Sequence, residues 1–219
     1  MISSWAVGAC FVASYSFAKD IFALLTLPLV KVMPDQSSMI FTGLAEGFFT
    51  YLKVSFLTGI LLASPVIFYQ LWAFISPGLY SNEKKYMFPF TFFSVIFFVG
   101  GALFGYFVVF PFAFEFFMSF NNDQIMALPS LKEYLAFSTK LLLAFGMAFE
   151  LPIFIFFLAK LGIVTVEGLA RNRKYFLVGA FIAAAILTPP DVVTQILMAI
   201  PLMLLYELGI IAARLTAKK

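Results

Sequence analysis

The 219-residue sequence contains no histidine, a single cysteine and few charged side chains. The absence of histidine removes the most common general base and metal ligand, and with it a serine–histidine protease site. Cys10 alone allows neither an intrachain disulfide bond nor a thiolate zinc site. Because no nucleophile–base pair or cluster of metal ligands is visible, we expect no enzyme activity, no metal and no cofactor.

Charged residues make up 11% of the chain and hydrophobic residues 63%, against about 25% and about 45–50% in a soluble domain. A chain of this size cannot enclose so much apolar surface in a soluble core, so the composition indicates a membrane protein in contact with lipid. The net charge of +3 does not indicate nucleic-acid binding, since the position of each basic residue matters more in a membrane protein.

Long continuous apolar runs predict an all-α membrane protein with six transmembrane helices rather than a β-barrel. The expected spans are 2–17, 48–75, 88–117, 135–161, 175–187 and 192–213, and residues 18–47 are expected to link the first two. The fifth run, of about 13 residues, covers only about 20 Å of an apolar layer about 30 Å thick. Without a soluble domain or fixed-period repeat, residues 1–219 are expected to form one polytopic domain.

The basic residues between the predicted spans alternate between the two sides of the membrane. Nine lie on one side and three on the other, namely Lys84, Lys85, Lys160, Arg171, Arg173, Lys174, Arg214, Lys218 and Lys219 against Lys19, Lys31 and Lys132. The positive-inside rule places the nine in the cytoplasm, and with them both chain ends. The first run could also be a signal peptide, but it lacks a basic start and an obvious small-residue cleavage site.

Glu150 is the most costly ionisable residue within a predicted span, because a charged side chain there costs about 2.5–3.5 kcal/mol on insertion scales. It stands two residues before Pro152, which can kink the helix. Two interpretations remain open: a glutamate that only satisfies the kink, and a functional polar site facing a cavity or a partner helix. Lys53 and Lys140 lie nearer the outer span ends, where their side chains can snorkel to the interface.

Proline and glycine positions predict how the helices bend and pack. One proline lies inside each of four predicted spans, at Pro65, Pro111, Pro152 and Pro201. Each is expected to bend its helix and so to favour a concave bundle. Gly101 and Gly105 form a small-xxx-small pattern that predicts close helix packing.

A tight turn, Thr188-Pro189-Pro190-Asp191, separates the last two predicted spans. Thr188 is expected to be the N-cap of the sixth helix, with Pro189 at its first position. Asp191 then places a carboxylate near the positive end of that helix.

The second loop, residues 76–85, is short and mostly polar, with Pro77 near its start and Glu83 beside two lysines. On charge alone, Glu83 could be solvated and paired locally, or it could receive a cationic ligand from the cytoplasm.

Several segments occur in a characteristic order and spacing along the predicted spans and loops. They are Glu46 to Phe49 with Lys53, Pro65, Gln70 to Tyr80, Glu83, Phe149 to Pro152, Leu187 to Asp191, Gln195, Pro201, and Tyr206 with Glu207. Together they resemble the TatC family, the multispanning receptor of the twin-arginine protein translocase. The resemblance implies a kinked, glove-like bundle with both termini cytoplasmic and with short fifth and sixth helices.

The resemblance also implies a function and site residues. Folded precursor proteins with a paired-arginine signal peptide would dock on the cytoplasmic side and cross by the protonmotive force without ATP. Glu83 would offer its carboxylate to the signal-peptide arginines, and Phe74 would pack the apolar part of the signal peptide.

The family also implies partners in the bacterial inner membrane. Glu150 would meet the signal peptide or a polar residue of the single-span subunits TatA or TatB. Thr188 and Gln195 resemble the family's polar patch for these partner helices, in a complex that is homo-oligomeric with TatB. Structural turns and kinks would fall at Pro77, Pro152, Pro189, Pro190 and Asp191.

The sequence departs from the family at its start, which normally carries a cytoplasmic His-Leu-x-Glu-Leu-Arg type motif. This chain begins Met1-Ile2-Ser3-Ser4, so we expect either an N-terminal truncation or a misplaced start. The family's Pro-x-Glu before the second span is also changed, since no proline precedes Glu46 at that spacing. The competing hypothesis is an ion-coupled carrier of small solutes, motivated by Glu150 and Asp191 and weakened by the missing inverted repeat.

Overall fold

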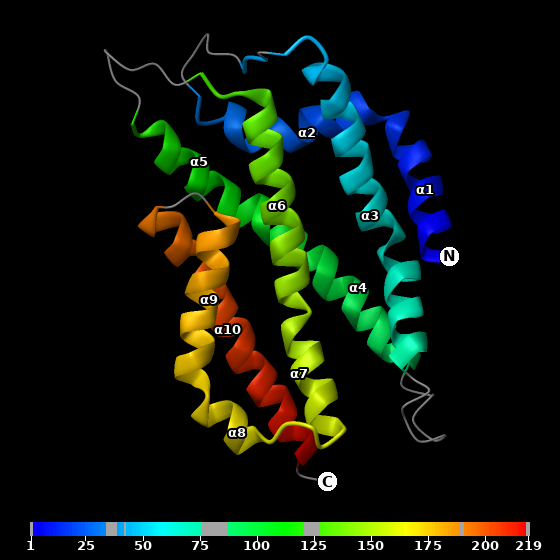
Figure 1. The fold of residues 1–219 in the computed structure, drawn as a ribbon, viewed down its shortest axis with the longest axis vertical. Helices are drawn as coiled ribbons and strands as arrows, with labels where there is room; N and C mark the ends of the chain where they lie inside the picture. The colour runs from blue at the N-terminus through cyan, green and yellow to red at the C-terminus, as the bar shows by residue number, and fades with distance from the viewer. Residues whose placement is uncertain are drawn as a thin grey trace. The chain divides into compact units, whose positions relative to one another are not determined.

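The structure is a computed structural model that describes residues 2–33, 39–41, 43–75, 87–120, 128–188 and 191–217, and every regular element in these ranges is a helix (Figure 1). The elements are α1 (Ile2–Tyr15), α2 (Ala18–Val30), α3 (Glu46–Ile75), α4 (Met87–Phe104), the π-helical turn η3 (Gly105–Val109), α5 (Phe110–Met118), α6 (Leu131–Phe149), α7 (Leu151–Lys160), α8 (Val166–Arg171), α9 (Arg173–Leu187) and α10 (Val192–Ala217). The all-α class predicted from the sequence is therefore confirmed.

Four stretches of helix are long and apolar enough to cross a membrane. They are Glu46–Ile75, Phe88–Met118, Leu131–Lys160 and Val192–Leu215. Helices α1 and α2 would supply a fifth if counted as one span, although they meet at a bend of 85°. The described part of the chain thus contains the long helices expected for the second, third, fourth and sixth spans.

Of three helices compared with the sequence-based expectation, α2 and α10 differ from it and α9 agrees. Residues 18–30, expected to link two spans, form the apolar helix α2. Helix α9 has 15 residues, or about 22 Å, and is short as expected against an apolar layer of about 30 Å. Helix α10 has 26 residues, so the expectation of a short sixth helix is wrong in terms of helix length.

The prolines affect the helices unequally. Pro65 and Pro201 lie inside the continuous helices α3 and α10. Pro111, by contrast, lies in the first turn of α5 directly after the π-helical turn. A π turn is wider than an α turn, and so it accommodates a residue that lacks the N–H group and crowds the carbonyl four residues before it.

The described residues cluster into two compact units, and α4 and α6 contribute to both. Unit 1 contains residues 1–95 and 106–140, and unit 2 contains residues 96–105 and 141–219. In unit 1, α1 and α2 both pack against α3, and Figure 1 shows α1 and α3 side by side. The contact is close at Gly59, where an added Cβ atom would lie 3.0 Å from the backbone nitrogen of Phe11.

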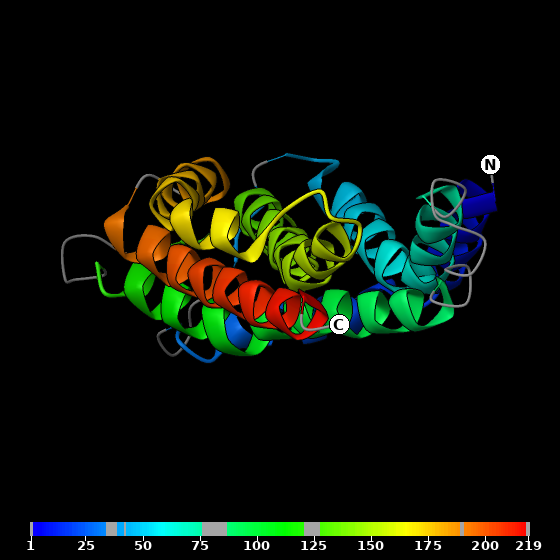
Figure 2. The ribbon, with the colours of Figure 1, turned by 90° about the horizontal axis from the view of Figure 1, so that it is seen from below.

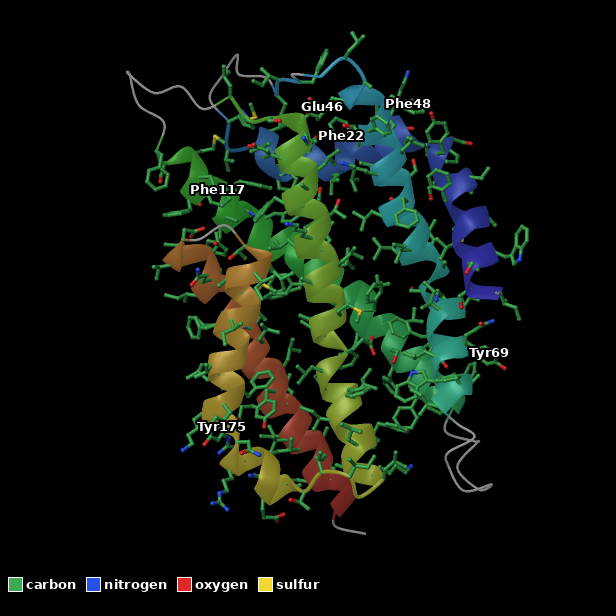
Figure 3. All side chains as sticks on the ribbon, in the orientation of Figure 1. Phe22, Glu46, Phe48, Tyr69, Phe117 and Tyr175 are labelled. Atoms are coloured by element: carbon green, nitrogen blue, oxygen red, sulfur yellow. The ribbon has the colours of Figure 1, made fainter. Side chains whose placement is uncertain are left out.

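Glu46 joins the starts of two helices within unit 1. Its side chain accepts hydrogen bonds from the backbone N–H groups of Gly43 at 3.1 Å and of Lys132, in the first turn of α6, at 2.7 Å. An isolated parallel β-bridge nearby pairs Ile40 with Ser130. A carboxylate is favourable at the positive ends of both helices. Figure 3 labels Glu46 at this end of α3 and Tyr69 toward the other.

In unit 2, glycines near the end of α4 and at the start of η3 allow a close approach to α6. An added Cβ atom at Gly101 would lie 2.9 Å from Cβ of Phe149, and one at Gly105 would lie 3.4 Å from the ring of Phe145. In return, an added Cβ atom at Gly146 of α6 would lie 2.8 Å from the ring of Phe98. The close packing predicted from the small-xxx-small pattern is confirmed.

Helix α10 packs against α7, α8 and α9 in unit 2, and Figure 2 shows α8 beside the C-terminal half of α10. The buried core of this packing is formed by Ile155, Tyr206, Ile210 and Ala213. The ring of Phe176 stacks on Tyr206 with centroids 4.0 Å apart, and the Tyr206 hydroxyl donates to Leu169 O at 2.8 Å. These contacts hold α8 and α9 against α10 at one end of unit 2.

Candidate functional site

Glu150 lies at the break between α6 and α7, where the long predicted fourth span divides into two helices. Its own N–H group donates to Met147 O at 3.2 Å, and its carbonyl accepts from Phe154 N at 2.9 Å. Pro152 occupies the first turn of α7, where a missing N–H group is tolerated. The residue is half-buried and its Oε1 atom is buried.

Closely packed helices of unit 2 surround this break. The ring of Phe104 lies 5.4 Å from the ring of Phe149, the residue before Glu150. On the α10 side, an added Cβ atom at Gly209 would lie 3.3 Å from Cα of Pro152. Two neighbouring helices, α4 and α10, therefore pack against the backbone on either side of the glutamate and fix where its side chain begins.

The α9–α10 turn is a second cluster of polar side chains in unit 2. Asp191 precedes the first residue of α10 and accepts two hydrogen bonds from Thr194, at 2.7 Å from N and 2.5 Å from Oγ1. Asp191 is therefore the N-cap of α10, and the assignment of that cap to Thr188 is wrong. Its carboxylate does lie at the positive end of the helix.

Thr188 instead ends α9, with an extended backbone and a buried side chain. Both its N–H group and its hydroxyl donate to Ala184 O at 2.8 Å. Gln195 is half-buried in the first turn of α10, and its N–H group donates to Asp191 O at 3.3 Å. The chain thus brings Thr188, Asp191 and Gln195 to one short turn, as their sequence spacing requires.

Phe74 lies near the C-terminal end of α3 in unit 1, and its side chain is 84% exposed. An exposed aromatic ring at a helix end is available to a ligand or to lipid. Glu83, Pro77, Pro189 and Pro190 lie outside the described residues.

An ion pair that was not predicted lies at the start of α9. Arg173 Nε and Nη2 donate to the two carboxylate oxygens of Glu207 at 2.6 and 2.8 Å, a two-point geometry that lysine could not match. Both residues were visible in the sequence, Arg173 after a loop and Glu207 six residues beyond Pro201, but their pairing depends on how α9 packs against α10. Among the described residues, no group of histidine, cysteine, aspartate and glutamate is placed to hold a metal ion.

Comparison with known proteins gives a consistent result along the chain. The family model described as Sec-independent protein translocase protein (TatC) matches residues 1–201. A TatC protein of Desulforapulum autotrophicum is 56% identical over 214 residues, which cover 98% of this chain and 79% of the relative. The Escherichia coli K12 TatC protein is 42% identical over 95% of this chain and 81% of its own length.

A solved structure agrees with the sequence comparisons. The chain is similar to the crystal structure of the twin arginine translocase receptor TatC, with a TM-score of 0.87 and 44% identity. The match covers 99% of this chain and 95% of that one. On the family match, the identity to these relatives and the shared fold, the chain belongs to the TatC family of Sec-independent protein translocase proteins.

Proposed function

We propose that this protein is the non-enzymatic receptor subunit at the core of a twin-arginine translocase. It binds paired-arginine signal peptides of folded precursor proteins on the cytoplasmic side, and it assembles with TatA and TatB for export driven by the protonmotive force. The observation that supports this best is the similarity to the twin arginine translocase receptor TatC over 99% of the chain, at a TM-score of 0.87.

The proposed topology is a single domain of six spans in the bacterial inner membrane, with both ends in the cytoplasm. Its support is the presence of four long apolar helices with the bent pair α1–α2 and the short α9 beside them. Nine of the 14 basic residues would then lie on the cytoplasmic side. Large exposed apolar side chains such as Trp5, 77% exposed, and Leu215, 73% exposed, fit a surface covered by lipid.

The proposed signal-peptide site combines Glu83 with Phe74. The loop that carries Glu83 follows directly on α3, so the acid lies nine residues after Phe74 in the chain. A carboxylate binds guanidinium groups in a two-point geometry, while an exposed phenylalanine offers apolar contact. Together they match the chemistry of a signal peptide in which an apolar segment follows paired arginines.

The proposed partner contacts lie in unit 2, at Glu150 and at the turn that carries Thr188 and Gln195. A polar group within a span is favourable only when it meets another polar group, so a polar residue of an inserted helix fits Glu150. The exposed side chains of α10, which include Val192, 71% exposed, and Ile200, 55% exposed, provide apolar surface for a single-span helix of TatA or TatB. We further propose that the subunit is homo-oligomeric in its complex with TatB.

A carrier of small solutes is less well supported. That hypothesis needs Glu150 and Asp191 as ion-binding acids. Both carboxylate oxygens of Asp191 are bonded to Thr194 as a helix cap, which gives this acid a structural role. Family membership also favours the translocase subunit over a carrier.

Site-specific crosslinking to a paired-arginine signal peptide in membranes that contain TatA and TatB tests the proposal. Glu83→Ala should weaken capture at least fivefold, while Glu133→Ala, a change of an acid at the start of α6, should leave capture unchanged. Replacing the two signal-peptide arginines by lysines should reproduce the loss, because lysine lacks the two-point geometry. Capture that Glu83→Ala leaves unchanged would overturn the assigned role of Glu83.

A further inference from the structure

A cavity of about 600 Å³ lies entirely within unit 2, at the end where α7 stops and α8 begins. The end of α7, the loop before α8, α8 itself and the last turns of α10 line it. Its apolar lining residues are Ala159, Val164, Val166, Ala170 and Ala213. Three polar side chains, Thr165, Glu167 and Arg214, complete the lining. A largely apolar cavity with a few polar groups is typical of a ligand site.

The two charged side chains of this cavity have opposite signs and do not pair with each other. Within the described part of the chain, neither Glu167 nor Arg214 forms an ion pair, whereas Arg173 and Glu207 nearby in the same unit do. Both residues are exposed. A ligand that carries one positive and one negative charge could therefore satisfy both at once.

Thr165 adds a directed donor to the site. Its Oγ1 atom caps α8 by accepting a hydrogen bond from Gly168 N at 3.1 Å. The hydroxyl hydrogen remains available for a ligand, because a capping hydroxyl accepts and can still donate. Thr165 and Arg214 together offer a neutral and a charged donor to an anionic oxygen.

The surroundings of the cavity fit a lipid better than a soluble metabolite. Ile163, 65% exposed, follows the lining residue Gly162, and Leu215, 73% exposed, follows Arg214, so apolar surface continues away from the cavity. The loop and the tail that border the cavity carry basic residues and are proposed to face the cytoplasm. Headgroups of the inner leaflet lie at that level.

We propose that this cavity binds the headgroup of a zwitterionic aminophospholipid. The phosphate lies against the Arg214 guanidinium and the Thr165 hydroxyl, the ammonium lies against the Glu167 carboxylate, and the acyl chains follow the exposed apolar side chains beyond the cavity. The site would give the protein a preference for phosphatidylethanolamine over phosphatidylglycerol, because the latter has no cation for Glu167. The inference does not require signal-peptide binding, so a failed capture experiment would leave it intact.

The test is lipid retention measured by native mass spectrometry on the full chain, purified from equal mixtures of phosphatidylethanolamine and phosphatidylglycerol. The wild-type protein should retain phosphatidylethanolamine about threefold or more over phosphatidylglycerol. Glu167→Gln should abolish that preference, and Arg214→Gln should lower retention of both lipids. Arg171→Gln, a change on α8 that does not touch the cavity lining, is the matched control and should change nothing.

Two further measurements keep the outcome decisive. The exchanged pair Glu167→Arg with Arg214→Glu should recover the phosphatidylethanolamine preference, which a variant that merely failed to fold could not do. Soluble phosphoethanolamine should compete only at much higher concentration than the lipid. Equal retention of the two lipids by the wild-type protein, an unchanged preference in Glu167→Gln, or competition by phosphoethanolamine at lipid concentrations would each overturn the proposal.

Discussion

The hydroxyl group of Tyr106 donates a hydrogen bond of 2.5 Å to the backbone carbonyl of Leu24 in α2. Leu24 stands four residues before Pro28, which has no N–H group, so this carbonyl lacks its usual helical partner. Tyr134 donates in the same way to the next carbonyl, Leu25 O. Side chains from η3 and α6 thus donate hydrogen bonds to backbone oxygens of the proline-containing helix α2. Such bonds are needed because an apolar environment supplies no water to bond these oxygens.

Replacing Tyr106 by phenylalanine is expected to lower the free energy of unfolding by about 0.6–1.7 kcal/mol, the range for hydrogen bonds between membrane helices. The loss should be smaller in a Pro28→Ala background, because an alanine N–H group can bond Leu24 O within the helix. Equilibrium unfolding in detergent micelles, as a double-mutant cycle, measures the difference. Tyr15→Phe is the control, and an equal loss in that variant would contradict the explanation.

Gly100 and Gly101 are expected to respond differently to the same substitution. An added Cβ atom at Gly101 would lie 2.9 Å from Phe149 Cβ, whereas one at Gly100 would meet no atom within 4 Å. Gly101→Ala should therefore destabilise the protein by about 1–3 kcal/mol through overpacking. Gly100→Ala should be neutral or stabilising, since alanine favours the helix. Similar unfolding midpoints for the two variants would show that α4 and α6 are not packed as described.

The sequence predicted the long apolar helices and the packing glycines well, because both depend on local composition and spacing. It missed α2, since Lys19 and Asp20 at its start and Pro28 within it resemble a loop boundary when read alone. It could not distinguish Pro65, which a continuous helix contains, from Pro111, which follows a π turn. That difference depends on which neighbouring groups replace the lost backbone hydrogen bond.

The candidate site also combines features that local sequence predicts with features that only tertiary packing reveals. Sequence spacing alone predicts that Thr188 and Gln195 lie at one turn, but it does not predict which residue caps α10. Threonine and aspartate are both good caps, and the helix begins after Asp191 rather than after Thr188. The Arg173–Glu207 pair joins residues 34 positions apart, so only tertiary packing reveals it.

Substitution of Asp191 is expected to reveal its role as a cap. Asp191→Ala should cost about 0.5–2 kcal/mol of stability, because Thr194 N loses its acceptor. Asp191→Asn should lose less, since an amide oxygen still accepts that bond. Thr188→Val should have a small effect on stability, because Ala184 O keeps its bond from Thr188 N. Thermal unfolding of the three variants in detergent checks this order, and a larger loss in Thr188→Val than in Asp191→Ala would contradict it.

Variants of Glu150 are expected to separate the two interpretations of this residue. If Glu150 meets a polar group of an inserted helix, Glu150→Leu should lower crosslinking to the signal peptide or to TatB by about tenfold, which corresponds to about 1.4 kcal/mol of lost contact. Glu150→Gln, which still hydrogen-bonds, should retain most of it. The unfolding midpoint in detergent should stay within error in both variants, because the backbone beside residue 150 is held by the packing of Phe104 on Phe149 and of Gly209 on Pro152. Glu115→Leu, at an exposed acid of α5, serves as the control. A fall in the midpoint that parallels the fall in crosslinking would instead favour a glutamate that only satisfies the helix break.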